Sequence, residues 1–256
     1  MQKKNEMEIF PGIKIFNGYP AVYFENIDLL AISDLQLGEE LYLAEQGIFV
    51  PQTQLKEILK ELKEIFRIVR PKTFLINGDV KHEFGEASSQ EWREVIELVN
   101  YLRKKVKEII IVRGNHDNYL LNIASKLGLK VFDPFYQVNK ILFTHGHKKI
   151  NFPKKVEIVV IGHEQPAILL IEGYDRIKVP CLLYGKLENG KKIICLPAFS
   201  PLASGVAINV ASREELLSPI LKEIDLDELI PIALDKETGA LKFPKLKFLK
   251  QEISLA

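Results

Sequence analysis

Five short apolar runs, each followed closely by polar side chains that can bind metal or titrate, most constrain how this chain folds. They occupy residues 27–33, 73–77, 108–113, 140–144 and 157–161. Each run is rich in Ile, Val, Leu or Phe and too short for a typical helix, which favours strands buried on both faces. The sequence therefore predicts a sheet whose strands are covered on both sides.

Helical patterns separate these predicted strands. Residues 55–69 place apolar side chains at helical spacing before Pro71, and Ser88 with Glu91 forms a capping box that opens a second helix. A shorter helix is expected over 119–127, ending at Gly128. Strands that alternate with helices predict an α/β layered fold.

The rest of the chain predicts a second sheet within one domain spanning 1–256. Residues 168–210 contain short β-like runs broken by Gly, Pro and Asn-Gly. We treat residues 211–256 as a C-terminal extension, with a helix beginning at Ser212 and an edge strand within 239–256. A hairpin about residues 188–191 would put Cys195 opposite Tyr184, so Cys181 and Cys195 would face opposite sides of the ribbon and pack without a disulfide.

The polar residues after the five runs form the candidate site, because ligands of open α/β sheets bind beyond the carboxyl ends of the strands. All five histidines of the chain belong to this set. The set is Asp34, Gln36, Asp79, His82, Asn115, His116, Asp117, His145, His147, His163 and Gln165. Oxygen and nitrogen donors without thiolate suit Mn, Fe, Zn, Co or Ni, and their number exceeds the need of one ion.

In order, the strings "DLQ", "GD", "GNHD", "HGH" and "GHEQ" resemble the calcineurin-like metallophosphoesterases, whose pattern is Asp-x-His, Gly-Asp, Gly-Asn-His-Asp or Glu, His, and Gly-His-x-His. The resemblance spans residues 31–167 and is most similar to an uncharacterised archaeal branch. It implies a four-layer α-β-β-α sandwich and hydrolysis of a phosphate ester by a metal-bound hydroxide.

The resemblance also implies the role of each site residue. Asp79 would bridge two ions. Ion A would be held by Asp34, Gln36, Asp79 and Gln165, and ion B by Asp79, Asn115, His145 and His163. His116 would protonate the leaving oxygen and Asp117 would orient its ring, while His147 and Arg113 are candidates for supporting or phosphate contacts.

Gln36 and Gln165 stand where the family has histidine, and both fall on ion A. A neutral amide oxygen is a poorer ligand than imidazole for Zn, Co or Ni, which favours Mn or Mg at a weakened site A. Three interpretations stay open at this point. They are a hydrolase with a weak site A, a non-catalytic binding or scaffold protein, and a one-ion enzyme whose glutamine amides bind phosphate.

Other sequence features bound the function. We find no serine-hydrolase elbow, phosphate loop or dinucleotide motif, no membrane-spanning run, and a net charge of +1, so we expect a cytoplasmic protein without membrane binding. The substrate would be a compact phosphomonoester or phosphodiester, with nucleotide or nucleic acid as alternatives. Lysines at 148, 149, 154 and 155 favour a solvated loop over a phosphodiester track, and residues 39–52 would form a lid, a substrate wall or a contact in an oligomer.

Overall fold

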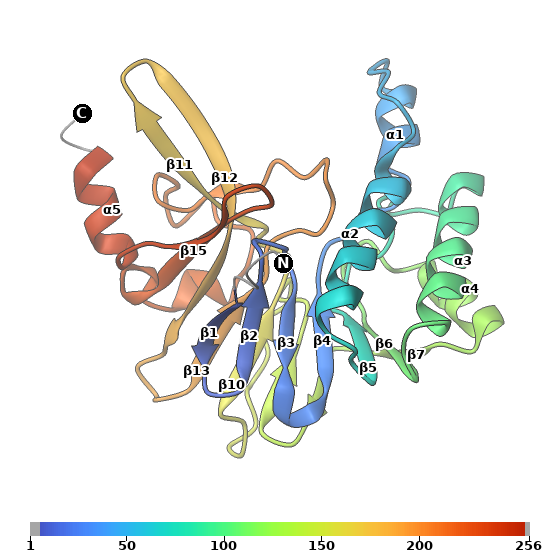
Figure 1. Ribbon diagram of the computed structural model, residues 1–256, viewed down its shortest axis with the longest axis horizontal. Helices are drawn as coiled ribbons and strands as arrows, with labels where there is room; N and C mark the ends of the chain where they lie inside the picture. The colour runs from blue at the N-terminus through green and yellow to red at the C-terminus, as the bar shows by residue number, and fades with distance from the viewer. Residues whose placement is uncertain (1–5, 254–256) are drawn as a thin grey trace.

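The computed structural model describes residues 6–253, and within them the strands form two sheets stacked face to face (Figure 1). The first sheet has the order β1-β2-β3-β4-β5-β6-β7, antiparallel from β1 to β4 and parallel from β4 to β7. Its strands are β1 (Glu6–Phe10), β2 (Ile13–Phe16), β3 (Val22–Phe24), β4 (Leu29–Ile32), β5 (Thr73–Ile76), β6 (Glu108–Val112) and β7 (Lys130–Phe132).

The second sheet has the order β14-β11-β12-β13-β10-β9-β8, and β15 and β16 join it beside β12. Its parallel centre is β9, β10 and β13. The strands are β8 (Tyr136–Val138), β9 (Ile141–Phe143), β10 (Ile158–Ile161), β11 (Pro166–Glu172), β12 (Asp175–Lys186), β13 (Lys192–Cys195), β14 (Val206–Ala207), β15 (Ile230–Asp235) and β16 (Gly239–Lys242).

Helices cover the outer faces of both sheets, so the predicted four-layer arrangement is confirmed. The outer face of the first sheet packs against α2 (Gln54–Ile68), α3 (Ser89–Arg103) and α4 (Leu120–Leu127). The second sheet is covered by short 3₁₀ turns and by α5 (Leu246–Ile253). The remaining elements are α1 (Glu39–Glu45), η1 (Glu25–Ile27), η2 (Leu221–Glu223) and η3 (Leu226–Glu228).

Strand β4 shows why the central runs are apolar throughout. Leu30 and Ile32 pack against the helices, whereas Leu29 and Ala31 pack against the second sheet, and all four are buried. Alternate side chains of a strand point to opposite faces, so a strand between two layers needs apolar residues at every position. All five runs identified in the sequence form strands within the predicted ranges.

The helix boundaries follow their capping residues. Ser88 accepts a hydrogen bond from the Glu91 amide, and Glu91 bonds back to the Ser88 amide, as the capping box predicts. Helix α4 ends at Gly128, whose φ of 60° closes the turn.

The expected hairpin register is wrong by one residue. Leu183, not Tyr184, lies opposite Cys195, because residues 188–190 form a three-residue loop that ends at Gly190 with a φ of 81°. Cys181 and Cys195 therefore face the same side of the ribbon, two positions apart along the pairing. Both are buried, and they are free thiols in one apolar cluster, so the expected packing without a disulfide is confirmed.

Two expectations for the C-terminal extension fail. Residues around Ser212 form turns instead of a helix, and the Glu215 carboxylate accepts from the Ser212 amide. The edge strand is limited to β16, and the segment after it is helix α5, whose Leu246 and Leu249 lie one turn apart and pack into the second apolar layer.

Candidate metal centre

The candidate residues lie at the end of the sheets where β4 leads into α1, and Figure 1 shows α1 and the β11–β12 hairpin projecting on opposite sides of this end. Asp34 and Gln36 follow β4, Asp79 follows β5, and His163 and Gln165 follow β10. These five residues all have φ between 49° and 65°. Left-handed backbone at non-glycine residues is costly and concentrates at functional sites. The strand ends therefore turn sharply to aim these side chains inward.

Two glycines allow the loops to meet. A Cβ at Gly114 would lie 2.1 Å from Oδ1 of Asp79, and a Cβ at Gly78 would lie 2.2 Å from Nδ1 of His145. Any larger residue at either position would push a candidate ligand out of place.

The site B residues converge. One ligand atom each from Asp79, His145 and His163 lies within 4.8 Å of the others. Nε2 of His145 lies 3.2 Å from Oδ1 of Asn115 and 3.3 Å from Oδ2 of Asp79. Nδ1 of His145 bonds the Asn77 carbonyl at 2.8 Å, which fixes the proton on Nδ1 and leaves Nε2 free to bind a metal. This donor set fits a divalent ion.

The site A residues are arranged differently. Nε2 of Gln36 donates to Oδ2 of Asp79 at 2.9 Å, and Nε2 of Gln165 donates to Oδ1 of Asp34 at 3.2 Å. Oε1 of Gln36 is in turn 3.0 Å from Nδ1 of His82. Both amide groups thus place N–H donors, which cannot bind a cation, on the two carboxylates that site A would use.

His116 has its ring fixed from two sides. Nδ1 contacts the carbonyl of His82, and the Phe84 ring packs over the imidazole with a centroid distance of 3.7 Å. The backbone amide of His116 donates to Oδ1 of Asp79 at 3.0 Å, and Nε2 lies 3.8 Å from Oδ2 of Asp79. Nε2 is therefore the ring atom that faces the candidate metal site.

The expectation that Asp117 orients the His116 ring does not hold in the structure. The buried carboxylate of Asp117 instead accepts from the backbone amides of Asp79, Val80 and Gly114, at 2.8–2.9 Å. The Asp117 carboxylate therefore joins the loop after β6 to the loop after β5. The His82 carbonyl, and not Asp117, contacts the His116 imidazole.

Comparison with known proteins identifies the family. The sequence profile of the calcineurin-like phosphoesterases matches residues 27–210, which is most of the chain. The chain belongs to this family. By its family it is a metal-dependent phosphoric ester hydrolase. No curated protein matches the chain.

A solved structure with a TM-score above 0.5 supports this fold, and two others match with lower scores. The nuclease MPE of Pseudomonas putida superposes with a TM-score of 0.65 at 16% identity, covering 94% of this chain and all of that one. The phosphoesterase Yfce of E. coli gives 0.39 at 20% identity, covering 70% and 84% of the two chains. A mutant Vps29 from Entamoeba histolytica gives 0.37 at 14% identity, covering 84% and 99%.

The charges of this phosphoesterase site favour a cation. Burial opposes a charge on His145, but Asp79, Asp34 and the Asn77 carbonyl together outweigh it and raise the pKa of His145 to about 10. Burial and the charge of His145 lower the pKa of His163 to about 4, and burial raises the pKa of Asp34. Burial and the neighbouring Asp79 raise the pKa of Asp117 to about 6. The carboxylates that favour a positive charge on His145 would also favour a metal ion in place of the proton on Nε2.

The supporting candidates divide into near and distant residues. The His147 ring lies 5.3 Å from that of His145, and burial lowers the pKa of His147 to about 4. Arg113 is paired with Asp133 at 2.6 Å, and Lys149 is paired with Glu223. These basic side chains are engaged with acids in the structure.

Several contacts that shape the site were not predicted from the sequence. The His82 and Asn77 carbonyls bond the imidazoles of His116 and His145, and Phe84 stacks on His116. Ser218 donates to the Gly146 carbonyl at 2.8 Å, far along the chain from the histidine loops. The string "NGDVKHEFG" contains Asn77, His82 and Phe84. A contact made by a backbone carbonyl does not depend on the residue type, so the sequence could not predict it.

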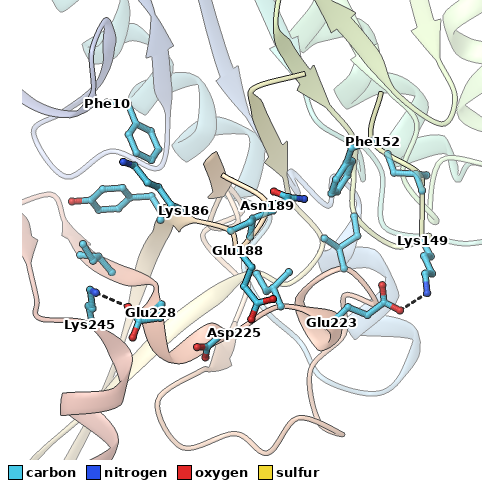
Figure 2. Close-up of a pocket in the computed structure, with 17 residues that line it drawn as sticks. Phe10, Lys149, Phe152, Lys186, Glu188, Asn189, Glu223, Asp225, Glu228 and Lys245 are labelled. Carbon is cyan, nitrogen blue, oxygen red and sulfur yellow. Dashed lines mark hydrogen bonds and ion pairs between the residues drawn. The ribbon is translucent and has the colours of Figure 1, made fainter. Parts of the chain in front are cut away.

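The structure also contains a cavity of about 670 Å³ (Figure 2). It is formed by the β12–β13 turn, the loop at Lys149 and Phe152, and the extension at Glu223, Asp225 and Glu228. None of the proposed metal ligands lines it.

Among the described helices, none is both long and apolar enough to cross a membrane.

Proposed function

We propose that the chain hydrolyses a phosphomonoester or phosphodiester with a strong metal site B and a weakened site A. The observation that carries the proposal is the convergence of Asp79, His145 and His163 within 4.8 Å, with Nδ1 of His145 already bonded to a carbonyl. Asn115 is the fourth expected ligand, since its Oδ1 lies beside Nε2 of His145. Divalent ions at such a centre supply Lewis-acid activation of water and phosphate.

Site A is proposed to consist of Asp34, Asp79, Gln36 and Gln165. Its two carboxylates are held in place, but to offer an oxygen to an ion each glutamine amide must first rotate away from the carboxylate it bonds. That rearrangement lowers metal affinity at A relative to B. Mn is the ion we favour, because it accepts oxygen donors and imidazole; Mg, Fe, Ni, Co and Zn are the alternatives.

His116 is proposed as the general acid. Nδ1–H donates to the His82 carbonyl, so Nε2 faces the site, and in the imidazolium form the proton at Nε2 can pass to the leaving-group oxygen. Asp117 contributes by joining the two loops that carry His116 and Asp79. Its part in the reaction is therefore to hold geometry, without a contact to the imidazole.

The substrate is proposed to be a compact phosphate ester, with a nucleotide or a nucleic-acid end as specific candidates. A nuclease shares the fold along nearly the whole chain, but at its low sequence identity this similarity is evidence for the fold alone. A cytoplasmic location and an archaeal source also stay predictions.

The test is a titration of Mn(II) into metal-stripped protein, with hydrolysis of a nitrophenyl phosphodiester and a nitrophenyl phosphomonoester followed in parallel. Asp79→Asn, which removes the carboxylate proposed to bridge both ions, controls for contaminating phosphatase. We expect turnover that rises with Mn(II) up to high concentration and is lost in the control, and the preferred ester sets the substrate class.

The contrary outcome is equally clear. If neither ester is cleaved with any divalent ion, even in Gln36→His/Gln165→His, the hydrolase proposal fails and a binding protein on a phosphoesterase frame replaces it. If the parent turns over with one bound ion at saturation, the one-ion interpretation replaces the weak site A.

A further inference from the structure

We propose that Lys81 is a positioning residue, which sets the His116 imidazole for proton transfer through the loop of residues 82–85. The inference rests on the role proposed above for His116. The Lys81 side chain bonds Glu83 and Gly85 and pairs with Glu91, so it acts through this loop.

Lys81 is a charged side chain in an unusual place. It is 0% exposed, and its Nζ lies 3.8 Å from Oε1 of Glu91, which is 1% exposed. Removing two charges from water costs several kcal/mol per ion, so a buried pair often adds little to stability compared with apolar residues of the same size. The reason for this buried ion pair therefore lies in the backbone groups that Lys81 and Glu91 bind.

The pair grips one short loop. Nζ of Lys81 donates to the carbonyls of Glu83 and Gly85, the latter at 3.2 Å. Oε1 of Glu91 accepts from the Glu83 amide at 2.8 Å. Both backbone polar groups of Glu83 are thus bonded to the two members of one buried ion pair, which fixes the path of the loop.

This loop makes both contacts that fix the His116 ring. The residue before Glu83 supplies the carbonyl at Nδ1, and the residue after it, Phe84, supplies the ring that packs over the imidazole at 3.7 Å and 30°. The carbonyl selects the tautomer, and the phenyl ring sets the tilt. Small errors in such an alignment cost large factors in rate, about 100-fold for a displacement of about 1 Å.

The test compares Lys81→Met with the pair Lys81→Met/Glu91→Gln, which leaves no buried charge if the single variant folds poorly. Lys236→Met is the matched control, because Lys236 pairs with the buried Glu61 on helix α2, in a contact that does not involve loop 82–85. Each protein is assayed with Mn(II) on the nitrophenyl ester and on the phenyl ester, whose leaving oxygen is more basic and depends more on a general acid.

We expect the Lys81 variants to lose about 10-fold or more in kcat on the phenyl ester and less than about 3-fold on the nitrophenyl ester, as a defect in general-acid catalysis requires. Mn(II) affinity stays at the parent value. Adding His116→Ala to Lys81→Met costs nothing beyond His116→Ala alone. Equal losses on both esters, or additive losses in the combined variant, would overturn the inference.

A measurement without turnover separates this inference from the proposed function. Long-range ¹⁵N–¹H spectra of the imidazoles, with His116 assigned by its absence in His116→Ala, report which nitrogen carries the proton. We expect the Nδ1–H form in the parent and in Lys236→Met, and a mixture of forms in Lys81→Met. If the parent cleaves neither ester the hydrolase proposal fails, while an unchanged His116 signal in Lys81→Met refutes the positioning role by itself.

Discussion

His116 and Asp117 are neighbours in the chain, but their contacts point to different tasks. The imidazole is partly exposed at the site and fixed by a carbonyl and a phenyl ring. The carboxylate of Asp117 is buried and accepts three backbone amides. Replacing each residue should therefore produce a different kind of defect.

We expect Asp117→Asn to reduce the free energy of unfolding by about 2 kcal/mol or more, because an amide presents one oxygen to three donors and brings its own N–H group into their place. His116→Ala should change it by less than about 1 kcal/mol. Denaturant unfolding of both variants checks this. Equal stability of the two would mean that the loops do not depend on the Asp117 carboxylate.

A second prediction at this scale concerns the amides. Gln36→His/Gln165→His should change Mn(II) binding from one tight site to two, because imidazole replaces a donor that now faces a carboxylate with its N–H group. Calorimetry gives the stoichiometry. Gln137→His, at an exposed position on β8, controls for binding by an added surface histidine, and two tight sites already present in the parent would contradict the prediction.

The candidate ligands could be chosen from the sequence because each stands directly after a recognisable strand. The orientation of their side chains could not. The bond from Gln36 to His82 joins residues 46 positions apart, and Asp117 finds its partners among backbone amides. Residue identity contains no record of such partners.

Among the elements, the extension beyond the family match supports the site. The carboxylate of Glu164, which stands between His163 and Gln165, accepts from the amides of Leu217 and Ser218 at 2.7–3.2 Å. Ser218 also donates to the Gly146 carbonyl beside His145. One turn of the extension therefore ties together the two histidine loops of the second sheet.

We expect Ser218→Ala to weaken Mn(II) binding about 3-fold to 10-fold, since it removes one neutral hydrogen bond of about 1 kcal/mol from the loop that carries His145. Calorimetric titration measures the effect. Ser212→Ala, in the turn where the side chain is not part of this contact, should match the parent, and an equal loss in both variants would show that the extension acts without specific contact.

Element boundaries were predictable where a local signal decided them. The capping box at Ser88 and the glycine at 128 mark helix ends without help from the rest of the fold. The hairpin register could not be predicted, because the sequence around Asn189 is compatible with a loop of two, three or four residues. Helix α5 was mistaken for strand, because its polar and apolar residues alternate over part of its length and only packing of Leu246 and Leu249 selects the helix.

At the scale of the whole molecule, the apolar layer between the sheets sets the position of one sheet, with its candidate ligands, relative to the other. Phe143 is fully buried there, with its ring 5.1 Å from that of Phe24 on the facing sheet. Phe143→Ala should lower the free energy of unfolding by about 3–5 kcal/mol. The cost of Leu142→Ala, which faces the outer layer from the next position, would be about 2–5 kcal/mol.

The two variants differ in what else they change. We expect Phe143→Ala to weaken Mn(II) binding as well, because the sheets that carry the two halves of the site repack against each other, whereas Leu142→Ala leaves that layer intact. Unfolding curves with and without Mn(II) give both quantities. Equal metal affinity in the two variants would show that the spacing of the sheets does not govern the site.

The division of ligands between the sheets has a consequence for how the chain reaches its native state. Asp34, Asp79 and Asn115 come from one sheet, and His145 and His163 from the other, so neither sheet alone can form the centre. An ion that binds only when both halves are present favours the docked state by mass action, about 2.7 kcal/mol at a concentration 100 times its dissociation constant. Metal supply would then affect how long the two sheets of a newly made chain stay docked against each other. Cells short of the ion would contain more of this protein with its sheets apart, a form open to proteolysis.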